Sequence, residues 1–298
     1  MKLSTRKTLW AYTFLAVPLT FFLVVRFFPT LQAFLLSTRD WNADPAARTF
    51  VGWEHYSRAF EDARLHRAVL NTLLYTAIGV PAQLVLGLAI ALLLQSVRFA
   101  RGLYRAIYFA PYVTPAVAVA WAWSLLLSPQ LGYVNTLLVQ LGLPPQPFLS
   151  SPDQALVTVT GVVVWQYVGF QIVLFLVGLE SIPRMYYEAA EIDGANAWQR
   201  FMRITLPLLN PIIVFSVIIA TAAPSTGFLQ LFTQVLNLNF GDPGGPLNST
   251  LTVVLYIYQV AFGRFDLGYA AAISVLLFVF IFALTLVQLR VTRRKVDY

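Results

Sequence analysis

Long apolar stretches separated by short polar segments are the feature that most constrains how this chain can fold. Six stretches are long enough to cross a bilayer, because a helix rises about 1.5 Å per residue and the hydrocarbon core is about 30 Å thick. They cover residues 9–36, 68–94, 103–127, 155–179, 206–232 and 267–289. Only 11% of the residues are charged, whereas a soluble domain carries about 25%. We therefore predict an all-α integral membrane protein of six transmembrane helices that forms a single domain over residues 1–298.

The distribution of positive charge predicts the orientation of these helices. Thirteen of the 20 Lys and Arg residues lie near the N-terminus, in residues 95–105, in the loop 181–205 or after residue 289, and five lie in residues 37–67. Cytoplasmic loops of membrane proteins are enriched in Lys and Arg. Both termini and the loop 181–205 are therefore expected in the cytoplasm. The net charge of +7 is explained by this topology, so we expect no nucleic-acid partner.

The loop 181–205, between the fourth and fifth spans, is dense in charge and has a readable local structure. Pro183 suits the first turn of a helix, because its missing N–H would be unpaired there. Gly194 follows a run of helix-forming residues and can end that helix with a positive φ. A second short helix is expected after it. Ala189 and Ala190 are small enough for another protein to approach closely, although an ordinary connector would also fit these residues.

The residue inventory argues against an enzyme. The chain has no cysteine, which excludes disulfides and thiolate metal sites, and His55 and His66 alone are a weak metal signal, so we expect no metal. The lysines are Lys2, Lys7 and Lys295, and none lies in a GxxxxGK[ST] phosphate-binding loop. We therefore expect neither catalysis nor a cofactor in this chain.

The polar groups inside the spans are amides, hydroxyls and aromatic rings rather than charges. Ion-coupled transport and intramembrane catalysis depend on ionisable residues within the membrane, so both are disfavoured. Neutral hydrogen-bonding groups suit a neutral polyhydroxylated solute, but they can also simply join neighbouring helices. The residues in question are Tyr112, Gln166, Tyr167, Gln171, Thr221, Thr226 and Gln230.

The loop 181–205 resembles the EAA loop of binding-protein-dependent ABC transporter permeases. Glu188-Ala189-Ala190, Gly194, Ile204 and Leu206-Pro207 fill every position of that motif. The resemblance is strongest to the sugar and glycerol-phosphate importer subfamily, of the maltose-importer type, and it covers nearly the whole chain. Further matching stretches are residues 111–115, 132–135, 244–246, 256–258 and 268–270.

This resemblance implies an importer permease of the bacterial or archaeal cytoplasmic (inner) membrane, multi-pass and surrounded by lipid. The family implies a heterodimer with a sister permease, two ATPase subunits that bind ATP and Mg²⁺, and an extracytoplasmic solute-binding protein. The expected function is import of a sugar or related polyhydroxylated solute by alternating access. An importer for glycerol phosphate is the alternative within the family, and an ion-coupled secondary transporter is the alternative outside it.

The resemblance also implies two sets of site residues. Coupling to the ATPase would rest on a cytoplasmic coupling helix within the loop 181–205. Its residues are Glu188, Ala189, Ala190, Asp193 and Gly194. The substrate cavity would be lined from the third, fourth and fifth spans, with small residues and a proline in the fifth where maltose-type relatives place polar or larger groups. Its residues are Tyr112, Ala116, Gln166, Tyr167, Phe170, Ala220, Ala223, Pro224 and Gly227.

Overall fold

The structure is a computed structural model that describes residues 5–41, 49–97, 99–222 and 244–292. The described residues are helical apart from turns and one isolated β-bridge between Arg39 and Phe50, so the predicted all-α class is confirmed. The chain divides into two units, which we describe separately. One unit comprises Met1–Asp62 with Tyr256–Phe280, and the other comprises Ala63–Leu255 with Ile281–Tyr298.

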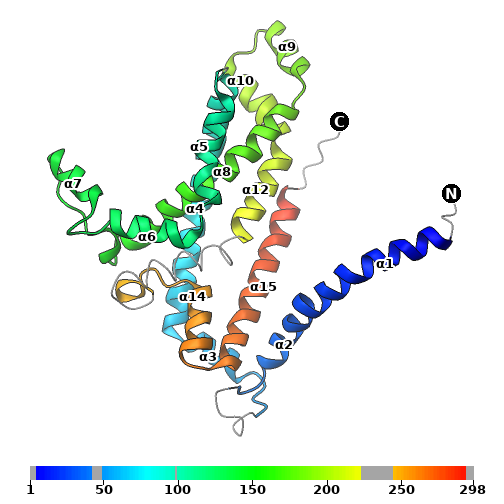
Figure 1. The fold of residues 1–298 in the computed structure, drawn as a ribbon, viewed down its shortest axis with the longest axis vertical. Helices are drawn as coiled ribbons and strands as arrows, with labels where there is room; N and C mark the ends of the chain where they lie inside the picture. The colour runs from blue at the N-terminus through cyan, green and yellow to red at the C-terminus, as the bar shows by residue number, and fades with distance from the viewer. Residues whose placement is uncertain (1–4, 42–48, 98, 223–243, 293–298) are drawn as a thin grey trace. The chain divides into compact units, whose positions relative to one another are not determined.

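The first unit begins with one long helical segment that coincides with the first predicted span. It consists of α1 (Thr5–Phe22), a π-helical turn (Leu23–Phe27) and α2 (Phe28–Leu36) (Figure 1). Residues Trp10–Leu36 are long and apolar enough to cross a membrane. Their side chains are exposed almost throughout, as expected for a helix that is hydrophobic all round and faces lipid or another chain.

A polar cluster holds the rest of the first unit together. The carboxylate of Asp62, which follows α3 (Glu54–Glu61), accepts hydrogen bonds from the hydroxyls of Tyr256 and Tyr269 at 2.5 and 2.8 Å. The guanidinium of Arg58 lies 4.0 Å from the ring centroid of Tyr269 and forms an ion pair with Asp266 at 2.8 Å. These contacts connect α3 and Asp62 to the residues just before α15 (Leu267–Thr292) and to its first turn.

The second unit is built on α4 (Ala63–Ser96) and α8 (Ala155–Ser181), which pack against each other. Glycines allow close approach to α8. A Cβ on Gly87 of α4 would lie 2.7 Å from the Cβ of Gln171 of α8, and a Cβ on Gly169 of α8 would lie 2.1 Å from the carbonyl oxygen of Tyr108, which belongs to α5 (Arg101–Val113). Small residues let helix backbones come together in this way in membrane proteins. The apolar core comprises Ala91, Leu94, Val168, Ile172, Phe175, Leu176, Leu179, Ile182 and Leu209.

The third predicted span is a broken pair of helices rather than one straight helix. Helices α5 (Arg101–Val113) and α6 (Ala116–Leu126) are bent by 93° relative to each other. Thr114 between them is extended, with φ −73° and ψ 134°. A residue before proline is driven into this conformation by the ring of the proline, here Pro115. The prolines were visible in the sequence, but the prediction of one continuous stretch over 103–127 missed the size of the bend.

The fifth predicted span is also bent. Ala197–Leu208 and Asn210–Thr221 meet at 64°, where α11 (Leu206–Leu208) gives way to α12 (Asn210–Ala222). Pro211 explains the break, because a proline lacks an N–H and its ring crowds the carbonyl four residues earlier. The last ten residues of this predicted span, 223–232, lie outside the described residues.

Four straight helices in the described residues can cross a membrane, and the count rises to six if each bent pair is one span. The straight ones include the second, fourth and sixth predicted spans, observed as Ala63–Ser96, Ala155–Ser181 and Leu267–Arg290. The protein is thus an all-helical membrane protein. The shorter elements are α7 (Tyr133–Gln140), two 3₁₀ turns (Phe148–Ser150 and Pro246–Asn248), α14 (Val253–Tyr258) and a π turn (Gln259–Gly263).

Candidate functional site: the EAA loop and an aromatic cluster

The loop 181–205, here called the EAA loop, folds as two short helices joined at a glycine. Helix α9 (Arg184–Ile192) begins after Pro183, and α10 (Ala197–Arg200) leads into a π-helical turn (Phe201–Thr205). Gly194 has a φ of +75°, a conformation in which a Cβ is unfavourable. The predicted helix, glycine turn and second helix are all observed.

Two sets of polar contacts stabilise α10 and its connection to α9. The side chain of Asn196 accepts a hydrogen bond from the backbone N–H of Gln199 at 2.9 Å, and the side chain of Gln199 accepts one from the backbone N–H of Asn196 at 2.9 Å. This reciprocal pair is a capping box at the start of α10. Glu191 of α9 also forms an ion pair with Arg200 of α10, and this pair connects the two helices across the turn at Gly194.

A hydrogen bond connects α9 to the last residue of the EAA loop, next to the start of the fifth span. The hydroxyl of Tyr187 on α9 lies 2.9 Å from Oγ1 of Thr205, which is 4% exposed. At the same end of this unit, Arg105 of α5 pairs with Glu180 of α8. Figure 1 shows α9 and α10 at the end of this unit where α5 begins. Arg105 and the EAA loop thus lie at the same end of this unit.

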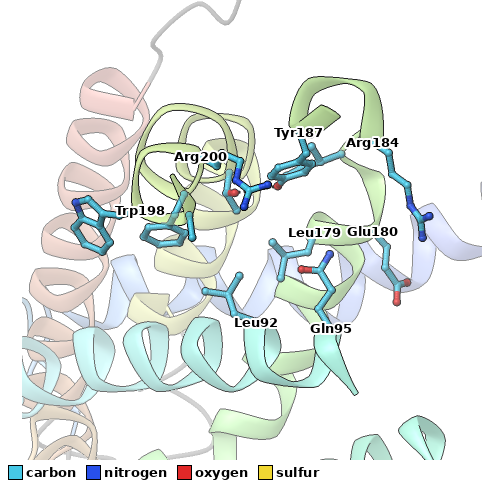
Figure 2. A pocket seen from close by; sticks show the side chains of 12 residues that line it. Leu92, Gln95, Leu179, Glu180, Arg184, Tyr187, Trp198 and Arg200 are labelled. Atoms are coloured by element: carbon cyan, nitrogen blue, oxygen red, sulfur yellow. Dashed lines mark hydrogen bonds between the residues drawn. The ribbon is translucent and has the colours of Figure 1, made fainter. Parts of the chain in front are cut away.

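A pocket of about 820 Å³ lies between the EAA loop and the ends of α4 and α8. In Figure 2, Tyr187 and Arg200 lie on one side of the pocket, and Leu92 and Gln95 of α4 lie on the opposite side. The remaining lining residues are Leu179, Glu180, Ile182, Arg184, Ala197, Trp198, Phe201 and Thr205. The pocket therefore lies between part of the EAA loop and the ends of helices α4 and α8.

The residues predicted to couple to an ATPase lie on the outside of the EAA loop. Glu188, Ala189, Asp193 and Gly194 are exposed, and Ala190 is half-buried. Sequence reasoning missed a set of large apolar side chains exposed on the same short loop. These are Met185, Tyr186, Ile192 and Trp198, whose exposed fractions are between 44% and 88%. Exposed apolar residues that gather in this way are typical of a surface that contacts another protein.

Part of the predicted substrate site forms an aromatic cluster between α5 and α8. The ring of Tyr112 stacks on Phe170 with centroids 5.1 Å apart, and it meets Tyr167 edge to face at 5.7 Å. Nε2 of the nearby Gln166 lies 3.5 Å from the carbonyl oxygen of Thr114, at the break of the third span. The Oε1 of Gln166 is buried without a hydrogen-bond partner among the described residues.

The other predicted substrate residues are only partly described. Ala116 is the first residue of α6, directly after the break, and Ala220 is buried on α12. Ala223, Pro224 and Gly227 lie outside the described residues. The structure therefore brings together Tyr112, Tyr167 and Phe170.

Most of the polar contacts that shape the EAA loop were missed from the sequence. The capping box had a local signal, because an Asn followed three residues later by Gln is its usual pattern. The Glu191–Arg200 and Tyr187–Thr205 pairs had none, because each forms only after the chain turns at Gly194.

Comparison with known proteins assigns this architecture to a family. A family model described as "Binding-protein-dependent transport system inner membrane component" matches residues 83–297. The trehalose/maltose transport system permease protein MalF of Thermococcus litoralis is 33% identical over 99% of this chain and 98% of its own length. The lactose transport system permease protein LacF of Rhizobium radiobacter is 32% identical over 95% and 94%.

A solved structure shows the same fold. A chain in the crystal structure of a bacterial alginate ABC transporter, in complex with an alginate pentasaccharide-bound periplasmic protein, has a TM-score of 0.83 at 23% identity. The match covers 98% of this chain and 96% of that chain. With the family model matching most of the sequence, this chain belongs to the family of binding-protein-dependent transport system inner membrane components.

Proposed function

We propose that this chain, a permease subunit of a binding-protein-dependent ABC sugar importer, moves a neutral sugar by alternating access driven by a separate ATPase. The observation that carries the proposal is the EAA loop. It is a pair of short helices that exposes small residues and large apolar side chains. Such a surface suits docking into a groove of a partner protein.

The mechanism follows from how the loop is attached. ATP binding would close an ATPase dimer, and α9 and α10 would move with it, connected by the turn at Gly194 and by the Glu191–Arg200 pair. The spans would then tilt so that the cavity opens outward to receive solute. Hydrolysis would return the cavity to the inside. Binding energy and hydrolysis drive such a change only through a difference in affinity for its two states.

The proposed assembly contains this chain, a sister permease, two ATPase subunits and an extracytoplasmic solute-binding protein. The six-span topology, with both termini and the EAA loop in the cytoplasm of the cell that carries it, belongs to the same proposal. It is supported by the charge distribution and by the four to six candidate spans. ATP and Mg²⁺ would be held by the ATPase subunits.

The aromatic cluster supports a neutral sugar as the solute. Tyr112, Tyr167, Phe170 and Gln166 offer ring faces, hydroxyls and an amide without any formal charge, and such groups suit a neutral polyhydroxylated molecule. Similar proteins are named for trehalose/maltose and for lactose transport. A glycerol phosphate would favour a cationic side chain beside it, so the neutral residues of this cluster argue against that alternative.

The experiment that tests the proposal is coupled ATP hydrolysis in proteoliposomes. This chain is co-expressed with its sister permease and ATPase, purified as a complex, and supplied with the binding protein loaded with each of a panel of neutral sugars. We expect one sugar to stimulate both hydrolysis and uptake, and Gly194→Asp to abolish uptake while the complex still assembles. Uptake that follows an imposed ion gradient without ATP would overturn the proposal in favour of a secondary transporter.

A further inference from the structure

The hydrogen bond between Tyr187 and Thr205 joins α9 to the residue that immediately precedes the fifth span. We propose that Tyr187 is a positioning residue that transmits displacement of α9 to this span through Thr205. The inference rests on the proposed function, because it assumes that a partner ATPase moves α9. It assigns to one hydroxyl a role that the docking surface alone does not supply.

Tyr187 belongs to the helix that a partner would contact. It lies in α9, near the middle of the helix, which runs from Arg184 to Ile192. Tyr187 is half-buried, one residue before the exposed Glu188. A partner that grips the outer face of α9 therefore moves the Tyr187 hydroxyl with it.

Thr205, the residue proposed to receive the displacement, is connected to the apolar core. Thr205 is the last residue of the π-helical turn, and its carbonyl accepts the backbone N–H of Leu209 at 2.9 Å. Leu209 is fully buried in the core formed by α4 and α8, and its side chain lies against Gly178. π turns insert one extra residue into a helix and are frequent at functional sites. A displacement of Thr205 should therefore move Leu209, the residue at which the fifth span enters the core.

The polar contact of Tyr187 is distinct from the packing of its ring. Tyr187 and Thr205 both line the pocket, opposite Leu92 of α4 (Figure 2). The ring of Tyr187 packs against the apolar core, and its hydroxyl makes the 2.9 Å contact with Thr205. Replacing Tyr187 with Phe therefore keeps the packing of the ring and removes the polar contact alone.

The Arg105–Glu180 pair is a poorer candidate for this role. Its side chains are 36% and 48% exposed, and ion pairs in contact with water contribute little. It also joins α5 to α8, neither of which follows the EAA loop in the chain. The Tyr187–Thr205 contact is more shielded, because Thr205 is buried.

The test is the number of sugar molecules imported per ATP hydrolysed by the complete complex in proteoliposomes. Tyr187→Phe removes one oxygen and keeps the ring. We expect the complex to assemble and hydrolyse ATP, with the import ratio lowered roughly five-fold, the change that loss of a buried hydrogen bond causes in an equilibrium. Tyr104→Phe removes the same atom from an exposed tyrosine of α5 and is expected to leave the ratio unchanged.

Variants of Thr205 separate transmission from a structural role. Thr205→Ser keeps the hydroxyl and should retain the ratio, whereas Thr205→Val keeps the shape and should lower it as Tyr187→Phe does. The double variant Tyr187→Phe with Thr205→Val should be no worse than Thr205→Val alone, because both remove the same contact.

Two results would overturn the inference. One is an unchanged import ratio in Tyr187→Phe when the wild-type complex is coupled. The other is a double variant whose loss is the product of the two single losses. If the wild-type complex itself shows no ATP-driven import, the proposed function fails, and the inference fails with it.

Discussion

Replacing Gly194 with alanine should uncouple ATP hydrolysis from transport without unfolding the protein. An ideal Cβ at this residue would meet no atom within 4 Å, so the substitution creates no clash. The destabilisation arises from the backbone, because φ is +75° and this conformation is about 1–2 kcal/mol less favourable for a residue with a Cβ. Since about 1.4 kcal/mol is a factor of ten in an equilibrium, the observed turn should become about five-fold to thirty-fold less populated.

The EAA loop has few contacts that would hold its turn in place against this strain. The polar contacts beside the turn are the Glu191–Arg200 ion pair, which joins α9 to α10, and the capping box at the start of α10. An exposed ion pair contributes about 0–1 kcal/mol and an N-cap about 1 kcal/mol. The strain at residue 194 is therefore comparable to the stabilisation from these contacts.

Gly142 offers a matched control for this prediction. Its φ is +76°, and an ideal Cβ there would also meet nothing within 4 Å, but it follows α7 and lies outside the EAA loop. Gly142→Ala and Gly194→Ala should lower the melting temperature by similar amounts. Only Gly194→Ala should lower sugar-stimulated ATP hydrolysis, and Gly194→Asn should lower it less, because Asn tolerates positive φ better.

The assay is sugar-stimulated hydrolysis by the co-purified complex, with thermal unfolding of each variant measured in the same detergent. Equal loss of stimulation in Gly142→Ala and Gly194→Ala would refute the reasoning, since it would show that backbone strain acts through general stability. Full stimulation in Gly194→Ala would refute it as well.

Two further predictions follow from the helix contacts and the aromatic cluster. Gly169→Ala should destabilise the protein by about 1–3 kcal/mol through overpacking, because its Cβ would meet the Tyr108 carbonyl. Gly161→Ala lies on the same helix, where a Cβ has open space, and its melting temperature should equal that of the wild type. Equal melting temperatures for the two variants would contradict the packing. Tyr112→Leu should raise the sugar concentration for half-maximal uptake by roughly three- to ten-fold, since an aromatic contact contributes about 0.5–1.5 kcal/mol. Tyr133→Leu, at an exposed tyrosine, should leave it unchanged, and equal effects would remove Tyr112 from the cavity.

The sequence predicted the features that depend on local patterns. The first, second, fourth and sixth apolar stretches coincide with candidate spans, because bilayer thickness sets a minimum length for each. The glycine turn of the EAA loop was predicted because a positive φ strongly selects glycine, and Gly194 adopts it. The start of α9 after Pro183 followed from the same local reasoning.

Features that depend on how distant segments meet were not predicted. The 93° bend between α5 and α6 needs more than the prolines, because the direction after an extended residue such as Thr114 is set by packing around it. The Tyr187–Thr205 contact joins residues 18 apart and exists only because the chain reverses at Gly194. The stacking of Tyr112 on Phe170 likewise depends on how α5 and α8 meet.

The measurement that tests the central claim most directly is site-specific cross-linking of α9 to the ATPase. The chain contains no cysteine, so a single Ala189→Cys variant can carry a photoreactive probe without a background signal. Leu131→Cys, at a residue that is 91% exposed on the predicted outer side, is the control. Capture of the ATPase by the probe at residue 189 and none at residue 131 is the result that the account predicts. Capture from residue 131, or none from residue 189 in an active complex, would contradict it.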